Sequence, residues 1–372
     1  MKLSVIVLNY KVPHFLQLCL ESVTRALLNI DSEIIVVDNN SQDSSISMLN
    51  ENFLEIKLIA NTQNVGFAKG NNQGVAIAKG EYICILNPDV VIPENCFTKI
   101  FEYIEGISNL GALGIRLIDG TGNYLPESKR NFPTLKVSLT KLLGDNATYY
   151  ANQLAQDENG LVPVLVGALM FLKRSVYVDL QGFDEDYFMY GEDIDLSYRL
   201  TQKGYSNYYL GSVKALHFKG ESSLKDKVYA RRFYGAMQIF NRKHHKSNAA
   251  TNWLIQTTLK LMILTHKTPQ SKKKLIPLNG GKFWVTDTIN SANDSLFLSE
   301  RELKTISLKK LNASRVADSL IVYDLNDLNV EAILESICLL KNNQNRFRIR
   351  PSNCNFIAGS DSSSELGEII SW

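Results

Sequence analysis

The sequence predicts an α/β fold built on a mostly parallel sheet. Short apolar runs rich in Val and Ile alternate with helical patterns, as in successive βαβ units. Several of these runs are apolar almost throughout, which is typical of strands covered by helices on both faces. A chain of 372 residues is also long enough for one large domain and a smaller one.

The first elements follow one another at short intervals. The run from Leu3 to Leu8 is shorter and more β-branched than the core of a signal peptide, and no small-residue cleavage site follows it, so it reads as a buried first strand. Pro93 suits the first position of a helix, where its missing N–H is no loss. Strands are expected at 3–8, 33–37, 56–60, 81–86 and 111–118, and helices at 13–28, 43–49, 66–79 and 93–103.

The pattern weakens between about residues 120 and 163, as expected of a lid or of a segment that faces an acceptor. Residues 162–172 are too few to span a bilayer and predict a buried core segment. A turn is expected at 182–184, and a helix over 192–202 that is closed by Gly204.

The last part of the sequence predicts a small α/β unit. Strands are expected at 319–323, 347–350 and 355–358, with a helix over 330–341. No motif assigns this unit a role, and binding a partner, binding an acceptor and self-association as a homo-oligomer all stay open. We therefore divide the chain into a main domain (1–245), a basic and apolar helical segment (246–275) and a small α/β domain (276–372).

Composition limits the partners. Forty basic and 38 acidic residues give a net charge of +2, which argues against nucleic acid as a ligand. The cysteines are odd in number and scattered without metal-ligand spacing, so neither a disulfide framework nor a zinc site is expected, and a reducing cytoplasm fits best. They are Cys19, Cys84, Cys96, Cys338 and Cys354.

Polar residues follow three of the expected strands, where open α/β sheets bind their ligands. Asn9 ends the first strand, Asp38 to Ser41 follow the second, and Asn87 to Asp89 follow a later one. Turn chemistry alone explains any one of these sites, but three at successive strand ends favour a binding site. No glycine-rich dinucleotide fingerprint or P-loop lysine is present, which disfavours a dehydrogenase and leaves a metal to neutralise a phosphate.

A second acidic cluster, Glu192-Asp193-Ile194-Asp195, stands at the start of a helix, with His217 further along. Acidic residues also favour helix starts for electrostatic reasons, and Asp195 and Arg199 are spaced for a surface ion pair. A histidine by itself is more often a hydrogen-bonded core residue than a ligand. A catalytic reading of Asp193 therefore depends on the other clusters.

Together these residues resemble glycosyltransferase family 2, and most closely its rhamnosyltransferase-like branch. The resemblance covers roughly the first 245 residues, and order and spacing both agree. It rests on SVIVLNY (4–10), VVDNNSQD (36–43), NVGFAKGNNQG (64–74), LNPD (86–89), GFDE (182–185), YGEDIDL (190–196) and HFKGES (217–222).

The resemblance implies a GT-A nucleotide-sugar-binding fold and an inverting transfer of a sugar from a nucleoside-diphosphate donor. Asp89 and His217 would hold Mg²⁺ or Mn²⁺, Asp193 would be the catalytic base, and Glu192 would orient the acceptor or cap the helix. The family's commoner metal motif has Asp at the position of Asn87, so one carboxylate ligand and weaker metal retention are expected. The donor-binding residues would be Asn9, Asp38, Asn40, Asn64, Lys69 and Asn87.

The resemblance also suggests the partners. The donor would be a dTDP or UDP sugar, with rhamnose as the first choice, and the acceptor a glycan or lipid-linked saccharide of a cell-surface polysaccharide. A catalytically silent module that binds nucleotide sugar or glycan is the alternative.

Basic residues beside an apolar stretch predict peripheral attachment to an anionic inner leaflet, although a helix packed on the main domain would look alike. The apolar stretch covers 253–264, and Lys272 to Lys274 follow it. The basic residues before it are Lys225, Lys227, Arg231, Arg232, Arg242, Lys243 and Lys246.

Overall fold

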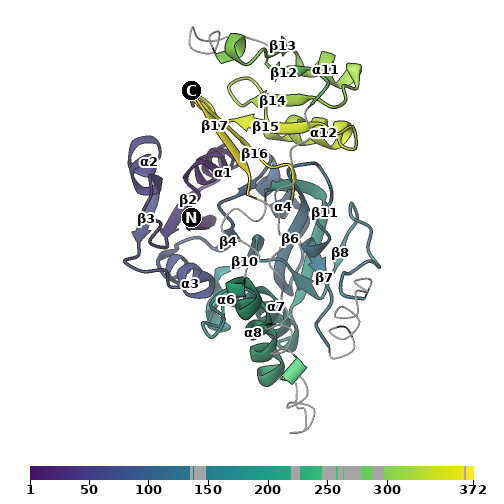
Figure 1. Cartoon of the computed structure of the whole chain (residues 1–372). Coiled ribbons are helices and arrows are strands. Elements are labelled where there is room, and N and C mark those ends of the chain that lie inside the picture. The colour runs from purple at the N-terminus through teal and green to yellow at the C-terminus, as the bar shows by residue number, and fades with distance from the viewer. Residues whose placement is uncertain are drawn as a thin grey trace.

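The computed structural model describes residues 1–134, 137, 148–218, 227–244, 257–258, 263, 278–286, 297–363 and 366–372. Within these residues the chain forms two main sheets, each with helices packed on it (Figure 1). The larger sheet belongs to the N-terminal part, and the smaller one is built by the last hundred residues or so. The α/β class, with a small C-terminal α/β unit, is confirmed.

In the described residues the large sheet has nine strands, which span Leu3–Asn9 (β1), Ser32–Asp38 (β2), Lys57–Ala60 (β3), Tyr82–Leu86 (β4), Val90–Val91 (β5), Leu110–Ile118 (β6), Asn159–Leu161 (β8), Leu169–Lys173 (β10) and Ser206–His217 (β11). Their order is β3-β2-β1-β4-β10-β6-β11-β5, and β8 also pairs with β11. The first four are mutually parallel, and β10 enters antiparallel between β4 and β6. β11 is parallel to β6 but antiparallel to β5 and β8.

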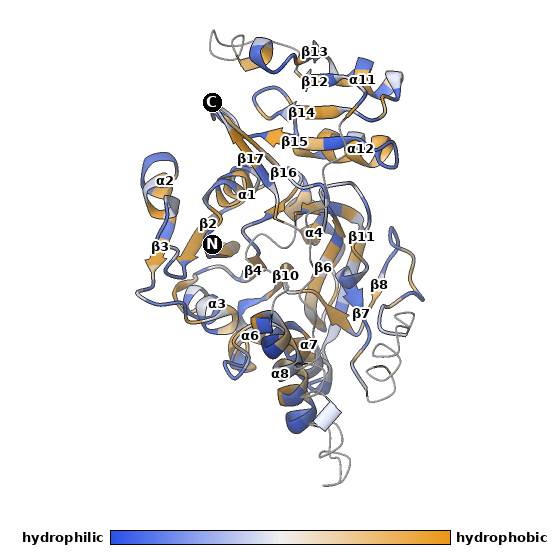
Figure 2. Cartoon of the chain, viewed as in Figure 1, coloured by the Kyte–Doolittle hydropathy of each residue, from blue (hydrophilic) through white to orange (hydrophobic). Residues whose placement is uncertain are grey.

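Helices cover both faces of this sheet, and they span Pro13–Ala26 (α1), Ser45–Asn52 (α2), Phe67–Ile77 (α3), Cys96–Ile104 (α4), Arg174–Asp179 (α6), Glu192–Gln202 (α7) and Lys227–His244 (α8). All seven residues of β1 are buried, because alternate side chains enter different cores. Val5 and Val7 pack with α1 and α4, while Ile6 packs with α3 and α7. Burial on both faces of the sheet explains why the apolar run of β1 is uninterrupted. Figure 2 shows the hydrophobic strands of both sheets.

The glycines of α3 allow this helix to lie close to the sheet. An added Cβ would come within 2.5 Å of Leu8 at Gly70 and within 2.6 Å of Ile6 at Gly74. Gly66, just before the helix, has a φ of 90°, and its Cβ would stand 2.6 Å from the carbonyl oxygen of Phe188. The run from Gly70 to Gly74 is therefore a helical packing surface, the second of the two readings that its sequence leaves open.

Helix α4 begins later than predicted. It starts at Cys96, and the Cys96 N–H donates to the Pro93 carbonyl at 3.0 Å in the turn before it. The buried side of the helix carries Cys96, Phe97 and Ile100. Burial of this apolar side sets where the helix starts, so the placement of Pro93 at its first position was wrong.

Strand β11 was hard to predict from the sequence. Its twelve residues include Ser, Asn, Lys and Gly, and its pairing with β6 shifts register twice, after Ser206 and after Leu210. Such irregularities break the period of two on which strand prediction depends. The predicted core segment 162–172 is buried as expected, but it comprises β9 (Val164–Leu165) and the start of β10 rather than one element. β9 pairs with β7 (Lys129–Arg130), which follows a short 3₁₀ turn, η1 (Pro126–Ser128).

The C-terminal unit has a six-stranded sheet in the order β13-β12-β14-β15-β16-β17, accompanied by helices α11 (Leu308–Ser314) and α12 (Val330–Leu340). The predicted strands and helix all begin and end within one residue of β14, α12, β15 and β16. Its strands span Lys282–Val285 (β12), Lys304–Ile306 (β13), Leu320–Asp324 (β14), Arg346–Arg350 (β15), Phe356–Gly359 (β16) and Glu368–Ser371 (β17).

This unit packs firmly on the large sheet's domain. One apolar cluster joins Phe15 of α1 and Phe218, just after β11, to Ile321 and Ile337 of the C-terminal unit. Arg25 of α1 donates to the carbonyl oxygens of Leu325 and Leu328 and to the Ser352 hydroxyl. The C-terminal unit thus contacts α1, which follows Asn9, and Phe218, which follows His217. It therefore supports the ends of β1 and β11 in the main domain.

Glu94 makes the most directed of these contacts. Its two carboxylate oxygens accept from the backbone N–H groups of Val330 and Glu331, the first two of α12, at 2.7 and 3.2 Å. Asn329 caps the third. We expect Glu94→Ala to lower the free energy of unfolding by about 1–2 kcal/mol, because two helix donors lose their partner. Urea unfolding beside Glu102→Ala, at an exposed position of α4, measures this, and equal stabilities would contradict it.

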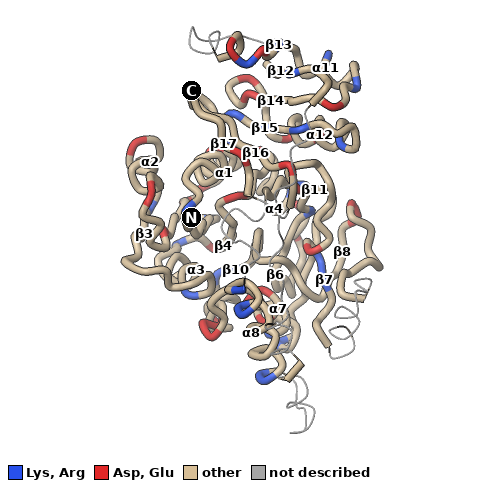
Figure 3. Tube along the Cα trace, viewed as in Figure 1, with Lys and Arg blue, Asp and Glu red and all other residues tan. Residues whose placement is uncertain are grey.

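The predicted membrane-binding segment lies largely outside the described residues. Of 253–264, only 257, 258 and 263 are described. The preceding helix α8 carries basic residues, shown blue in Figure 3, including Arg242 and Lys243 in its last turn. Among the residues whose positions are given, no helix combines the length and the apolar character needed to cross a bilayer.

Candidate active site

The three polar strand ends lie side by side, because β2, β1 and β4 are neighbours in the sheet. Asn9 stands opposite Asp38 in the parallel register of β1 and β2, and Val7 stands opposite Leu86, the residue before Asn87. The strand-end clusters expected from the sequence therefore share one edge of the sheet.

Asn9 and Asp38 form a buried network beneath this edge. The Asn9 amide donates to Asp38 Oδ1 at 2.8 Å, to Ser41 Oγ at 3.0 Å and to Ser45 Oγ at 2.9 Å. Asp38 also accepts from the backbone N–H of Ser41 at 3.0 Å. Both side chains are buried, so Asn9 fixes the loop after β2 from the side of the protein interior. The opposite side of this loop is left for a ligand.

A second network fixes the same loop from the side. Asn39 donates to Asn64 Oδ1 at 2.9 Å and accepts from the backbone N–H of Val65, also at 2.9 Å. Asn40 is held at a φ of 61° and is half-buried, and Lys69 on α3 is exposed. The structure thus joins Asn64 to the loop that carries Asn40 through Asn39, a residue that the sequence analysis did not single out, whereas no hydrogen bond or ion pair among the described residues joins Lys69 to them.

Asp89 and His217 meet at the next strand end. Asn87 to Val90 form a turn, with Pro88 at its second position and a 3.2 Å bond from the Val90 N–H to the Asn87 carbonyl. His217 pairs with Val90 in the β11–β5 ladder. This brings His217 Nε2 to 3.3 Å from Asp89 Oδ1, although 128 positions separate the two residues in the sequence printed here.

This pair fits a divalent cation. Two ligands bound at about 2.1 Å and at right angles stand about 3 Å apart, close to the observed separation. Asn87 Oδ1 and His217 Nδ1 are buried and find no hydrogen-bond partner in the part of the chain that the structure describes, as expected of groups that a ligand or ordered water satisfies. Among the described residues no cluster of three or more His, Cys, Asp or Glu could hold a metal. Asp89 and His217 could therefore hold a cation only together with oxygens of a bound diphosphate or water.

The acidic cluster opens α7. Gly191, at a φ of 84°, turns the chain into the helix, and Glu192, Asp193 and Asp195 are all buried in its first turn. Asp195 pairs with Arg199 at 2.6 Å and with His244 of α8 at 2.6 Å. The predicted ion pair with Arg199 therefore forms, but Asp195 is fully buried, so the pair is not on the surface.

Asp193 has three donors and one open position. Its Oδ2 accepts from Arg130 Nη2 at 2.7 Å and from the Gly167 N–H at 2.9 Å, and its Oδ1 accepts from the Ile194 N–H at 2.7 Å. A carboxylate has about four lone-pair sites, so with respect to the described residues one site on Oδ1 is free. An acceptor hydroxyl could bind at that site.

The backbone connects Asp193 to the metal pair in one short step. Gly167, which donates to Asp193, is followed by Ala168, whose carbonyl accepts from the Asn87 N–H at 2.9 Å. Asp193, the base expected from the sequence, and the turn of Asn87 to Val90 therefore both bond to the two residues that precede β10. The sequence signalled neither Gly167 nor Arg130, which lies in the weakly patterned segment 120–163.

Glu192 differs from Asp193 in forming no salt bridge within the described part of the chain. Burial, reinforced by the charge of Asp193 and only partly offset by Arg130, raises the pKa of Glu192 to about 8, and its Oε2 has no hydrogen-bond partner among the described residues. Glu192 is consequently protonated at neutral pH, whereas Asp193 forms a direct salt bridge with Arg130. Of the two, Asp193 suits a base.

This difference makes stability depend on pH. Between pH 4.5 and about 8 the folded protein keeps a proton on Glu192 that the unfolded chain has lost, so stability falls as pH rises through that window. With about 1.4 kcal/mol for each tenfold change in proton affinity, the loss is on the order of 3–5 kcal/mol. We expect Glu192→Gln to remove most of this pH dependence of the free energy of unfolding, measured by urea unfolding between pH 5 and 9. Parallel curves for the variant and the wild type would refute this, and Glu102→Gln is the control.

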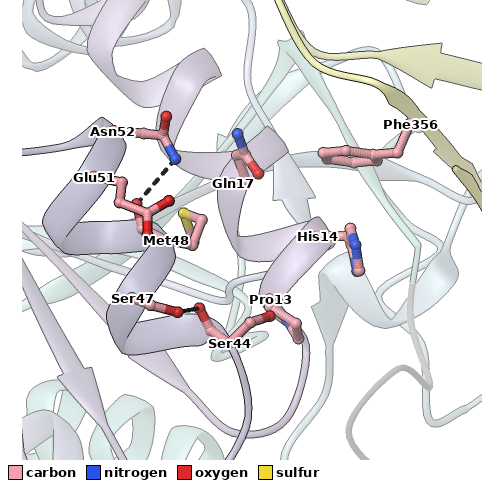
Figure 4. A pocket seen from close by; sticks show the side chains of 9 residues that line it. All are labelled: Pro13, His14, Gln17, Ser44, Ser47, Met48, Glu51, Asn52 and Phe356. Carbon is pink, nitrogen blue, oxygen red and sulfur yellow. Dashed lines mark hydrogen bonds between the residues drawn. The ribbon is translucent and has the colours of Figure 1, made fainter. Parts of the chain in front are cut away.

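A pocket of about 240 Å³ lies elsewhere, between α1 and α2 (Figure 4). Phe356 of β16 closes one side of it, so it marks the seam between the two units. None of the expected donor, metal or catalytic residues lines it. Its walls are Pro13, His14, Gln17, Ser44, Ser47, Met48, Glu51, Asn52 and Phe356.

Comparisons with known proteins point to one family of enzymes. Residues 4–180 match the model of glycosyl transferase family 2. The chain is 23% identical over 272 residues to the N-acetylglucosaminyl-diphospho-decaprenol L-rhamnosyltransferase of Mycobacterium tuberculosis, covering 67% of this chain and 89% of that protein. It is 28% identical over 201 residues to rhamnosyltransferase WbbL of Escherichia coli K12, covering 51% and 75%. Among solved structures, the mannosyltransferase PcManGT from Pyrobaculum calidifontis in complex with GDP-Man and Mn²⁺ has a TM-score of 0.48 and 16% identity, covering 70% of this chain and 69% of that one.

The sheet, with its polar edge beyond the parallel strands, defines a glycosyltransferase of the GT-A fold. More narrowly, residues 4–180 form a glycosyl transferase family 2 domain, and the curated relatives named above are rhamnosyltransferases. The family resemblance found in the sequence is confirmed.

Proposed function

We propose that this enzyme is an inverting, metal-assisted glycosyltransferase that moves a sugar from a nucleoside-diphosphate donor to a saccharide acceptor. The juxtaposition of two groups carries the proposal. One is the Asp89–His217 pair, which suits a cation and diphosphate, and the other is Asp193, whose Oδ1 keeps one open position. Gly167 and Ala168 hold the two groups beside each other.

The chemistry follows from this arrangement. An acceptor hydroxyl is a weak nucleophile near pH 7, and Asp193 takes its proton as the oxygen attacks the anomeric carbon. The bond from that carbon to the diphosphate breaks in the same step, so the configuration inverts. A cation held by Asp89 and His217 would stabilise the charge on the departing diphosphate. The loop from Asp38 to Asn40, together with Asn64 and Lys69, would receive the nucleoside.

The relatives suggest the substrates. The M. tuberculosis relative is named as a rhamnosyltransferase that acts on a sugar diphosphate of a polyprenol. We propose a 6-deoxyhexose such as rhamnose as the sugar, carried by dTDP or UDP, and a lipid-linked saccharide of a cell-surface polysaccharide as the acceptor. The segment that contains Arg130 and leads to Gly167 flanks the base and would contact the acceptor.

We also propose that the enzyme works in the cytoplasm, at the inner face of the membrane. The basic residues of α8, including Arg242 and Lys243, lead into the apolar stretch 253–264 and would face anionic lipid. Sedimentation with anionic liposomes at low salt tests this, and a protein that stays in the supernatant would count against it.

The main test is a donor panel. The purified chain is heated with nucleoside diphosphates and their sugars, with and without Mn²⁺, and the same donors are then assayed for transfer to a polyprenol-linked N-acetylglucosamine acceptor. We expect dTDP or UDP compounds to stabilise the protein only with metal, and one sugar to be transferred. Stabilisation without transfer from any donor would favour a silent binding module, and no stabilisation would overturn the donor site.

A further inference from the structure

Arg130 has a place in the site that the motifs do not assign. It lies in β7, and its side chain is 8% exposed. Nη2 donates to Asp193 Oδ2 and to the carbonyl of Leu165, both at 2.7 Å. Asp193 and Arg130 are 63 positions apart, so only folding brings them together.

The arginine is itself rigidly held. Arg130 pairs with Val164 of β9 and makes a bridge to Tyr150, while the neighbouring Lys129 donates from Nζ to the carbonyls of Ala151 and Leu154. Segments on both sides of residues 135–147 thus fix its position. The guanidinium cannot move away from Asp193 without breaking these contacts.

Charge balance in the cluster gives Arg130 a task. Glu192, Asp193 and Asp195 occupy one buried helix turn, where like charges repel strongly. Arg199 and His244 neutralise Asp195, and Glu192 lies against neither. Burial by itself would lower the pKa of Arg130, but the Asp193 carboxylate and Tyr149 outweigh it and raise that pKa, so the guanidinium stays charged.

We propose that Arg130 is a positioning residue for the transfer reaction: it holds Oδ2 of Asp193 and thereby turns the open site of Oδ1 toward the acceptor. This rests on the proposed role of Asp193 as base. Arg130 occupies Oδ2 together with the Gly167 N–H, so the acceptor hydroxyl has only Oδ1 to approach. Arg130 also lowers the pKa of Glu192, so without its charge the two adjacent carboxyls, as a pair, would take up a proton more readily.

The test compares Arg130→Gln and Arg130→Lys with the wild type. For Arg130→Gln we expect kcat to fall about 10²-fold with the donor KM changed less than threefold, because the loss concerns proton transfer. We expect the acidic limb of the kcat/KM profile to move up by about 1–3 pH units. Arg130→Lys keeps the charge and should recover most of both effects.

Two additions make the result specific. Recording the profiles in the Glu192→Gln background leaves Asp193 as the titrating carboxylate of the pair. Arg174→Gln is the control, since Arg174 is half-buried and, like Arg130, donates to a backbone carbonyl, that of Gly80, at 2.9 Å.

The outcomes separate this proposal from the proposed function. A wild type without transfer activity would overturn the proposed function itself. An active wild type whose Arg130→Gln variant is equally active, or loses activity with an unmoved acidic limb, would overturn the role of Arg130 alone. If Arg130→Gln fails to fold, Arg130→Lys decides. An acidic limb of its kcat/KM profile within about 0.5 pH unit of the wild type, with kcat largely retained, supports a charge-based role, and loss of activity at every pH refutes it.

Discussion

Replacing Asp193 with asparagine is expected to lower kcat of sugar transfer by about 10²- to 10⁴-fold and to leave donor binding nearly unchanged. Asparagine has the same shape, and its oxygen can still accept from Arg130 and from the Gly167 N–H. It cannot take a proton from the acceptor hydroxyl, however. The substitution therefore removes the base while the contacts with Arg130 and Gly167 survive, and only the contact of Oδ1 with the Ile194 N–H is lost.

Initial rates of transfer and thermal stabilisation by the donor with Mn²⁺ measure the two parts of this prediction separately. Asp179→Asn, at an exposed position on α6, is the control. A variant that retains more than a third of the wild-type rate would exclude Asp193 as the base, and a variant that loses donor stabilisation would point instead to a role in the donor site.

Replacing Asp89 with alanine is expected to abolish the metal-dependent stabilisation by nucleoside diphosphates and to lower transfer by at least about 10²-fold. Asp89 is the only carboxylate that the structure places against His217 at this strand end among the described residues. A lost cation contact to a departing diphosphate is worth several kcal/mol, and each 1.36 kcal/mol is about a factor of ten in rate.

Thermal unfolding with UDP or dTDP, with Mn²⁺ or with EDTA, tests this for the variant and for Asp179→Ala. The free protein should unfold at a similar temperature with and without the substitution, because Asp89 contributes no strong ion pair to the fold. Stabilisation by nucleotide that is equal in the variant and independent of metal would mean that the diphosphate is neutralised by other groups.

Tertiary structure also explains where the interpretation of the sequence was incomplete. β11 carries His217 to Asp89, yet two register shifts hide its alternation. The first turn of α4 starts after Pro93 because burial of Cys96 and Phe97 fixes the helix. In the same way, Arg130 belongs to a two-residue strand whose partner is β9, and no local pattern marks such a strand.

The sequence by itself determined the parallel half of the sheet, the polar ends of β1, β2 and β4, the acidic start of α7 and the family. These features are local, because two-sided burial, turn chemistry and helix starts leave their mark within a few consecutive residues. Only the tertiary structure decided that Asp89 meets His217, that Arg130 holds Asp193, and that the C-terminal unit packs on α1 and the end of β11. Contacts of this kind join residues far apart in the chain, and their energies depend on geometry that no short stretch of sequence contains.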